Sequence, residues 1–275
     1  MIVLGKPLAE TILLDLKERI ESHNLKPHLV IILAGENLAS RTYIKYKKIA
    51  AERIGLTVTV KEFAENQSTQ CINTIAQLNQ DPTVHGIIVQ LPVFASWPTE
   101  EVVNAVALHK DVDGFLPHSP FTPATADGVW EMLGEFARLE KFSSTEGFLK
   151  NKNIVVLGKG RTAGKPTRDL LRTKGFESQL IDSKTENPDH IISQSDVVIT
   201  ATGKKHIIHA DNIKEGSYVI GVGVGKEIVE GQEKLFGDID EHQIREKAAL
   251  YCPTIGGIGP LTIACLLRNV VIASS

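Results

Sequence analysis

Short apolar runs alternate with helical patterns along most of this chain, and this alternation restricts the possible folds more than any other feature. In the first half, segments with helical periodicity separate three apolar runs, at 28–35, 56–63 and 84–93. Strands that alternate with helices form parallel sheets covered by helices on both faces. The first half is therefore predicted to be an α/β domain, with a helix near 98–108 after its third strand.

A second alternating series begins near residue 151. Its apolar runs predict four more strands, at 153–157, 177–183, 195–203 and 217–224. A helical pattern at 127–141 and a polar stretch at 142–153 join the two series, and the domain boundary is expected there. The sequence therefore predicts an α/β fold of two domains. The last apolar helix, at 259–274, either closes the second domain or crosses back onto the first.

Composition excludes several classes of function. The formal net charge of −3 gives no bulk attraction to nucleic acid or to an anionic membrane. No apolar run approaches the roughly 20 residues that cross a bilayer, and the first residues lack the order of a signal peptide. The three cysteines, Cys71, Cys252 and Cys265, are far apart and form no CxxC pair. This pattern argues against a disulfide framework or a zinc site and favours a reducing, cytoplasmic location.

A glycine-rich turn directly follows the apolar run at 153–157. Gly158 and Gly160 permit a tight turn and a close approach of the backbone, and Gly164 ends the motif. The helix that follows offers its N-terminus to a pyrophosphate. The spacing is one residue longer than the usual dinucleotide fingerprint, so a purely structural turn is the alternative. Thr202 and Gly203, at the end of a later apolar run, complete the predicted cofactor site.

Two charged residues bear on which dinucleotide binds. Asp182 closes the strand after the glycine-rich turn, where a carboxylate accepts hydrogen bonds from a ribose 2′-OH and repels a 2′-phosphate. Lys159, within the turn, would instead attract that phosphate. Ser183 and Lys184 add possible phosphate contacts, so both NAD and NADP stay open.

The segment 40–56 carries two tyrosines and three lysines in one helical pattern. Ile44, Ala51 and Ile54 form its apolar side, whereas Tyr43 and Lys47 are four residues apart on another face. One interpretation is an ordinary solvated lysine face. The other is that Tyr43 and Lys47 lie together at a pocket.

Several stretches together resemble the methylenetetrahydrofolate dehydrogenase/cyclohydrolase family. They occur in the family's order: SRTYIKYK, HGIIVQLPV, KDVDGF, GKGRTAGKP, GDID and PTIGGIGPLT. The resemblance implies a folate-binding catalytic domain at 1–120 and 260–275, a Rossmann NAD(P)-binding domain at 121–259, and a folate site in the cleft between them. It also implies that the last helix returns to the first domain, that the protein is a homodimer, and that it serves one-carbon metabolism and purine biosynthesis.

The resemblance also implies roles for individual residues. Lys47 matches the family's catalytic lysine, with Tyr43 and Gln90 beside it, and Asp113 matches the residue that binds the pterin. The other residues expected at the substrate are Leu91, Pro92, Gly257 and Pro260. Lys45 and Lys48 are expected to face solvent. The plain alternatives are an Asp-Gly turn at Asp113, a strand-end cap at Gln90, and a flexible hinge at the double glycine before Pro260.

The implied chemistry suits these residue types. Hydride leaves the one-carbon unit of 5,10-methylenetetrahydrofolate for the nicotinamide, and water then converts the methenyl product to 10-formyltetrahydrofolate. A lysine can manage protons here if burial or a neighbouring cation lowers its pKa. Tyr43 suits stacking on the substrate ring, Gln90 can orient the amine, and Asp113 can accept paired hydrogen bonds from the pterin.

The chain departs from the family pattern mainly on the cofactor side. Lys159-Gly160 replaces the usual arginine-serine pair, Asp182 stands where histidine is common, and Ile255 replaces a proline. NADP is the family default, whereas Asp182 favours NAD. Two alternatives stay open: a dehydrogenase with weak or no cyclohydrolase activity, and a non-catalytic nucleotide-binding homologue. His206 and His209 have ligand-like spacing but no evident third ligand, so no metal site is predicted.

Overall fold

The computed structural model describes residues 1–229 and 232–275 of the chain. They form two compact units. The β1–β3 unit contains residues 10–124 and 263–275, and the β4–β10 unit contains residues 1–9 and 125–262. No helix in the described part of the chain is long and apolar enough to cross a membrane.

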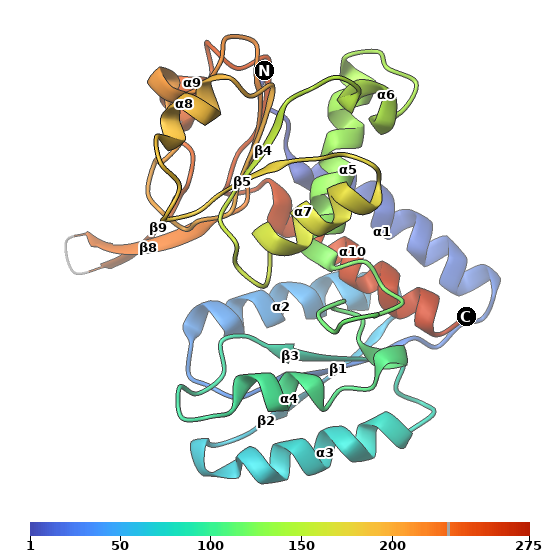
Figure 1. The fold of residues 1–275 in the computed structure, drawn as a ribbon. Helices are drawn as coiled ribbons and strands as arrows, with labels where there is room; N and C mark the ends of the chain where they lie inside the picture. Colours follow the sequence, from blue (N-terminus) through green and yellow to red (C-terminus); the bar gives the residue numbers. More distant parts are fainter. Residues whose placement is uncertain (230–231) are drawn as a thin grey trace. The chain divides into compact units, whose positions relative to one another are not determined.

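The β1–β3 unit is built on a parallel sheet with strand order β2-β1-β3. Its strands are β1 (His28–Leu33), β2 (Thr57–Glu62) and β3 (Gly86–Gln90). Its helices are α1 (Gly5–Ser22, most of which lies here), α2 (Leu38–Arg53), α3 (Ser68–Gln80) and α4 (Thr99–Asn104), with short 3₁₀ turns η1 (Glu65–Gln67) and η2 (Leu108–Lys110). Figure 1 shows α2 on one face of the sheet and α3 and α4 on the other. The predicted parallel sheet with helices on both faces is confirmed.

The last helix, α10 (Ile258–Ala273), contributes its C-terminal part to the β1–β3 unit. A Cβ at Gly86 would lie 3.2 Å from Val270 Cγ2 and 2.7 Å from Val112 Cγ2, so glycine on β3 leaves the space that the helix fills. The helix therefore packs on the first domain, as the family resemblance implies, and the alternative that it only closes the second domain is wrong.

The β4–β10 unit contains a five-stranded parallel sheet with strand order β10-β7-β6-β4-β5. The strands are β4 (Ile154–Leu157), β5 (Gln179–Ile181), β6 (Val197–Thr200), β7 (Tyr218–Gly221) and β10 (Leu250–Cys252). The helices are α5 (Ala124–Leu139), α6 (Thr145–Leu149), α7 (Gly164–Thr173), α8 (Pro188–Ser193) and α9 (Glu241–Ile244), with η3 (Ala210–Asn212). Helices α8 and α9 cover one face and α5 and α7 the other (Figure 1).

The sequence-based helix at 98–108 is wrong in length. Helix α4 ends at Asn104, and η2 begins separately at Leu108. The Asn79 side chain causes this break, because its amide donates to Ala105 O at 2.8 Å and accepts from Ala107 N at 3.0 Å. A side chain from α3 thus takes over the backbone groups that a longer helix would use.

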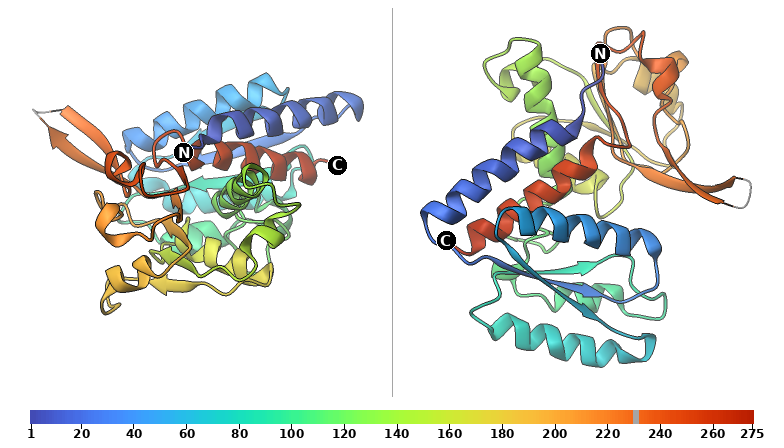
Figure 2. Two further views of the ribbon diagram at one scale, coloured as in Figure 1. Left: turned by 90° about the horizontal axis from the view of Figure 1, so that it is seen from above. Right: turned by 180° about the vertical axis from the view of Figure 1, so that it is seen from behind.

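Two further segments differ from the prediction. The polar stretch at 142–153 contains α6, whose N-terminus is capped by Ser144 accepting from Gly147 N at 3.0 Å. The run at 217–224 is not one strand: β7 ends at Gly221, and Val224 begins β8 (Val224–Val229), which pairs antiparallel with β9 (Gln232–Gly237). Figure 2 shows β8 and β9 reaching away from the five-stranded sheet.

Candidate active site

Helix α2 carries Tyr43 and Lys47, and its start is set by local hydrogen bonds. Asn37 caps the helix by accepting from Ala39 N at 2.9 Å and from Ser40 N at 3.2 Å. The helix therefore begins shortly after β1 ends at Leu33. The carboxyl ends of β1 and β3 lie side by side, because Leu33 pairs with Gln90. The geometry places α2 so that Lys47 reaches the end of β3.

The Lys47 ammonium is buried, with only 5% of the residue exposed. Its Nζ donates to Gln90 Oε1 at 3.1 Å and lies 5.3 Å from the centre of the Tyr43 ring. Burial lowers the pKa of Lys47, and the negative charge of Asp113 partly counteracts this shift. Lys45 and Lys48 are exposed, as predicted. Of the two interpretations of this helix, the structure supports the one in which Tyr43 and Lys47 lie together.

Gln90 orients the amine without adding charge. Its Nε2 donates to Leu91 O at 3.0 Å, which turns Oε1 toward Lys47. Leu91 O also accepts from Ser40 Oγ at 3.4 Å, so the end of β3 is tied to the first turn of α2. Pro92, predicted beside the substrate, is exposed at the same loop.

Asp113 lies in a loop whose backbone is held tightly. The neighbouring Asp111 carboxylate accepts from Leu116 N at 2.9 Å and Phe115 N at 3.3 Å. Gly114 has a φ of +70°, and a Cβ there would lie 2.7 Å from Pro123 N. The loop is therefore more constrained than a simple Asp-Gly turn requires.

The surroundings of Asp113 raise its pKa but leave the carboxyl ionised at pH 7. Burial raises the pKa of Asp113 to about 6, with Lys47 lowering it and Asp111 raising it. Lys47 and Asp113 are thus a coupled pair in which each charge stabilises the other against burial. A substrate that hydrogen-bonds to the carboxylate would find it ionised at neutral pH.

The glycine-rich turn lies between β4 and α7 and fits a dinucleotide backbone. Gly158 has a φ of +94°, and a Cβ there would come within 2.4 Å of Ala201 O. A Cβ at Gly164 would come within 1.9 Å of Gly158 O, whereas a Cβ at Gly160 would meet nothing within 4 Å. Helix α7 starts at Gly164 without a side-chain cap from the described residues, so its first N–H groups suit a pyrophosphate. Strand β4 lies between β5 and β6, which makes this the topological switch point.

Lys159 and Asp182 form an ion pair. From the sequence, these two residues are expected to have opposite effects on the choice between NAD and NADP. Lys159 Nζ lies 2.7 Å from Asp182 Oδ2, and Asp182 Oδ1 accepts from Lys184 N at 2.9 Å. The hydrogen bond from Lys159 lowers the pKa of Asp182, so the carboxylate is ionised at neutral pH. Ser183 and Lys184 beside it are exposed.

Comparisons with known proteins show the family of this chain. The catalytic-domain model of the tetrahydrofolate dehydrogenase/cyclohydrolase family matches residues 3–113, and the family's NAD(P)-binding-domain model matches residues 123–275. The chain belongs to the tetrahydrofolate dehydrogenase/cyclohydrolase family. It is 35% identical over 279 residues to the bifunctional protein FolD of Methanoculleus marisnigri, covering 98% of this chain and 94% of that protein.

Two solved structures of the family resemble this chain over nearly its whole length. The bifunctional FolD methylenetetrahydrofolate dehydrogenase/cyclohydrolase of Campylobacter jejuni superposes with a TM-score of 0.89 at 31% identity, covering 100% of this chain and 98% of that one. FolD of Trypanosoma brucei, complexed with NADP cofactor and inhibitor, also gives a TM-score of 0.89, at 26% identity, covering 99% of this chain and 96% of that one. The two-domain α/β fold with an NAD(P)-binding domain is confirmed.

Gly257 and Pro260, predicted at the substrate from family resemblance, belong to the β4–β10 unit. Gly257 packs closely against other backbone atoms, since a Cβ there would come within 2.0 Å of Pro253 O. Its carbonyl oxygen would be 1.8 Å from a Cβ at Gly5. Pro260 lies in the first turn of α10. Their role at the substrate stays a prediction.

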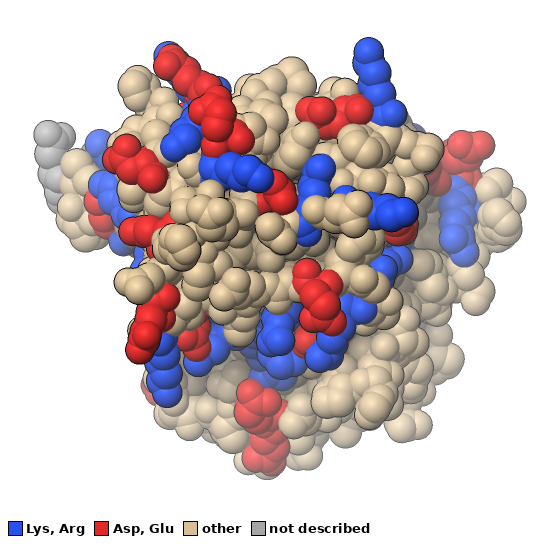
Figure 3. Space-filling view, turned by 45° about the horizontal axis from the view of Figure 1, so that its top comes forward, with Lys and Arg blue, Asp and Glu red and all other residues tan. Residues whose placement is uncertain are grey.

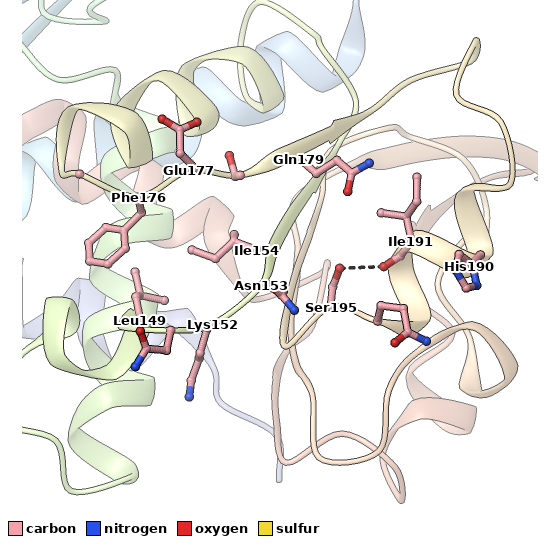
Figure 4. A pocket seen from close by; sticks show the side chains of 14 residues that line it. Leu149, Lys152, Asn153, Ile154, Phe176, Glu177, Gln179, His190, Ile191 and Ser195 are labelled. Atoms are coloured by element: carbon pink, nitrogen blue, oxygen red, sulfur yellow. Dashed lines mark hydrogen bonds between the residues drawn. The ribbon is translucent and has the colours of Figure 1, made fainter.

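One hollow lies away from the predicted site residues. Figure 4 shows it in the β4–β10 unit, with a volume of about 780 Å³. Its lining includes Asn153, Gln179 and Ser195, which precede or begin β4, β5 and β6. It therefore lies at the amino ends of these strands, at the edge opposite Gly158 and Asp182.

Neither the charged surface nor the two spaced histidines indicates a further site. On the face drawn in Figure 3, lysines and arginines are interspersed with aspartates and glutamates. His206 Nδ1 lies 3.7 Å from Asp240 Oδ2, and His209 Nδ1 lies 3.9 Å from Asp211 Oδ2. Within residues 1–229 and 232–275, no group of three or more metal-binding side chains comes together.

Sequence reasoning missed two residues that hold the Asp113 loop. Asp111 caps the loop from within, and Asn269 on α10 donates from Nδ2 to Val112 O and Thr122 O, at 2.9 Å each. Asn269 is 4% exposed. A signal was present, because an asparagine within the apolar run at 259–274 needs buried hydrogen-bond partners.

Proposed function

We propose that this chain oxidises 5,10-methylenetetrahydrofolate to 5,10-methenyltetrahydrofolate with NAD(P)⁺ and then hydrolyses the product to 10-formyltetrahydrofolate. The observation that carries this proposal is the buried Lys47 amine, held 3.1 Å from Gln90 Oε1 beside Tyr43 and coupled to Asp113. A lysine in such surroundings exchanges protons more readily near neutral pH than a solvated lysine does.

In the first reaction, the chain's own residues bind and orient the folate. Asp113 accepts hydrogen bonds from the pterin amino and ring N–H groups, and the Asp111 and Asn269 contacts keep its loop in place. The Tyr43 ring stacks on the substrate. Bound NAD(P)⁺ supplies the acceptor for the hydride that leaves the bridging carbon.

In the second reaction, water adds to the methenyl carbon. The neutral form of Lys47, made accessible by burial, accepts a proton from this water, and Gln90 keeps the amine directed toward the reacting carbon. The C–N bond on the N5 side then breaks, which leaves the formyl group on N10. Water and the methenyl cation thus give 10-formyltetrahydrofolate and one released proton.

The glycine-rich turn supports dinucleotide binding, and we propose that NAD is preferred over NADP. A Cβ at Gly158 or Gly164 would collide with backbone of Ala201 or Gly158, so glycine keeps the turn tight, whereas the open space beside Gly160 suits a close-lying pyrophosphate. Asp182 is ionised and repels a 2′-phosphate, and its ion pair neutralises the one turn lysine that would attract that phosphate. NADP in the complex of the Trypanosoma brucei relative favours the other choice, so the comparison has to be made directly.

The decisive experiment measures both reactions separately. Absorbance of reduced cofactor is followed with 5,10-methylenetetrahydrofolate and either NAD or NADP, and loss of methenyl absorbance is followed without cofactor. Both signals are expected. Cofactor reduction without methenyl hydrolysis would establish the dehydrogenase-only alternative, and neither signal would favour the non-catalytic homologue.

The preference for NAD over NADP is tested by comparing kcat/KM for the two cofactors. We expect a higher kcat/KM with NAD, and Asp182→Ser should shift the ratio toward NADP. A preference of the wild type for NADP by tenfold or more, about 1.4 kcal/mol, would contradict the role given to Asp182.

The family resemblance further supports a homodimer that supplies one-carbon units, including those for purine biosynthesis. Three free, buried cysteines favour a reducing, cytoplasmic compartment. Light scattering coupled to size-exclusion chromatography measures the oligomer directly, and a mass of 30.0 kDa would identify a monomer.

A further inference from the structure

Asp238 is a fully buried carboxylate at the carboxyl edge of the five-stranded sheet. It follows β9 directly, and its exposed fraction is 0%. Its Oδ2 accepts from Thr200 Oγ1 at 2.8 Å and from Thr202 N at 2.7 Å. Thr200 is the last residue of β6, so the carboxylate binds the chain where it leaves this strand.

Burial of the Asp238 carboxylate is unfavourable, and the surrounding residues partly compensate for it. Burial raises the pKa of Asp238, and hydrogen bonds from the Thr202 N–H and the Thr200 hydroxyl oppose that shift. A Cβ at Gly223 would lie 2.2 Å from Asp238 Oδ2 and 2.5 Å from Gly203 N. Glycine at 223 is therefore required for the carboxylate to fit against the loop. A buried carboxylate is weak evidence for stability, because apolar packing serves as well or better.

The backbone of Asp238 contacts two segments. Asp238 O accepts from Ile208 N at 3.0 Å, and Asp238 N donates to Gly223 O, after β7, at 3.2 Å. The loop from Ala201 to Ile208 is thus held by the side chain of Asp238 near its start and by the backbone of Asp238 at its end.

This loop adjoins the glycine-rich turn. A Cβ at Gly158 would meet Ala201 O at 2.4 Å and Thr202 Cγ2 at 3.5 Å. Any displacement of the loop after β6 would therefore change the space beside Gly158. Ligands of open parallel sheets bind outside the carboxyl ends of the strands, which is where both loops lie.

We propose that Asp238 is a positioning residue for the dinucleotide, which it serves by fixing the Thr202–Gly203 loop against the glycine-rich turn. This inference rests on the proposed function, because it assigns the loop to cofactor binding. Asp238 acts through Thr200 and Thr202, so its effect is confined to cofactor affinity and to the reaction that uses the cofactor. The hydrolysis reaction, which uses Lys47, Gln90 and water and no dinucleotide, does not depend on it.

The test compares Asp238→Asn with Asp196→Asn. Asp196 is a matched control at the opposite end of the same strand, where its carboxylate accepts from Asn153 N at 2.8 Å and Lys214 Nζ at 2.6 Å. Dissociation constants for NAD and NADP, cofactor KM, kcat and the cofactor-free hydrolysis of methenyltetrahydrofolate are measured for both variants.

Asp238→Asn is expected to weaken dinucleotide binding and raise cofactor KM by about tenfold or more, with methenyl hydrolysis within about twofold of the wild type. Asp196→Asn should leave cofactor affinity within about twofold, even if the protein unfolds at a lower temperature. Unchanged cofactor affinity in folded Asp238→Asn would overturn the proposal. An equal loss of both activities, shared with Asp196→Asn, would reduce Asp238 to a structural role and overturn it as well.

A second pair decides the matter if Asp238→Asn fails to fold. Thr200→Val removes the hydroxyl that donates to Asp238, whereas Thr200→Ser keeps it. Thr200→Val is expected to bind the dinucleotide several-fold more weakly than Thr200→Ser, and equal affinities would overturn the proposal. Wild-type protein that binds the dinucleotide without reducing it would contradict the proposed function, yet these affinity comparisons would still decide the role of Asp238.

Discussion

Lys47 Nζ lies 3.1 Å from Gln90 Oε1, which joins helix α2 to the end of strand β3. The partner is an amide and not a carboxylate, so the contact directs the amine without raising its pKa by an opposite charge. Burial lowers the pKa of Lys47, and the opposing negative charge comes from Asp113. The position of the amine and its proton affinity are thus controlled by different residues and can be changed separately.

Replacing Lys47 removes the proposed proton acceptor. Lys47→Met keeps an unbranched apolar chain in the buried site, so the protein should fold, while methenyl hydrolysis should fall by about 10²-fold or more. Lys48→Met is the matched control, since Lys48 is exposed one residue later on the same helix. The rate of methenyl loss is measured for both. Equal rates in the two variants would remove Lys47 from the mechanism.

Gln90→Glu should shift the pH dependence of hydrolysis. A carboxylate beside the amine favours the ammonium form and raises the pKa of Lys47, so the neutral amine becomes available only at higher pH. The midpoint of the rising limb of the hydrolysis profile should move up by about one unit or more. Gln80→Glu, at an exposed position, should leave the midpoint in place. An unshifted profile in folded Gln90→Glu would show that Lys47 does not set this limb.

The carboxyl of Asp113 should make folate binding pH-dependent. With its pKa raised to about 6, Asp113 is ionised at pH 7 and becomes neutral below pH 6. Folate KM should therefore rise as the pH falls below about 6, by up to about tenfold per unit. Asp113→Asn should have a high KM that is flat across this range, as steady-state kinetics from pH 5 to pH 8, roughly spanning the titration, would show.

The Asp113 carboxyl should also make the free energy of unfolding fall as the pH rises. Its pKa in the folded protein lies above the ordinary value of 3.8, so the folded state holds this proton more tightly than the unfolded state. The stabilising contribution is full below the ordinary pKa and is lost as the pH rises through about 6. Asparagine does not titrate, so Asp113→Asn should not show this loss. Between the ordinary pKa of 3.8 and about pH 6, the free energy of unfolding of the variant should therefore rise relative to that of the wild type. Denaturant unfolding at several pH values measures this, and an opposite trend would contradict the raised pKa.

Two glycines of the cofactor turn should respond differently to alanine. Gly164→Ala places a Cβ within 1.9 Å of Gly158 O, so the turn must shift, and cofactor-dependent oxidation should fall by about tenfold or more. At Gly160 a Cβ meets nothing within 4 Å in the protein, so Gly160→Ala should keep the unfolding temperature of the wild type, whereas Gly164→Ala should lower it. Methenyl hydrolysis should survive in both. Equal unfolding temperatures in the two variants would contradict the tight packing at Gly164.

Local patterns were sufficient for the elements that carry the site. The alternation of apolar runs and helices predicted the parallel strands. The run at 153–157 ends where β4 ends, at Leu157, whereas the run at 84–93 continues three residues past the end of β3 at Gln90. Helical spacing placed Tyr43 and Lys47 on one face, because that arrangement depends only on residues four apart. Elements governed by distant side chains were missed, as where Asn79 ends α4 and where β8 pairs with β9.

The sequence by itself determined the class of fold, the glycine-rich turn and the residue types available for chemistry, since these depend on periodicity and on steric limits within a few residues. Only the tertiary structure decided that Lys47 is buried against Gln90 and coupled to Asp113, that Lys159 pairs with Asp182, and that Asp238 holds the loop after β6. The physical reason is that burial and charge interactions depend on distance in space. These quantities are set by how the strands and helices pack, which no local pattern specifies.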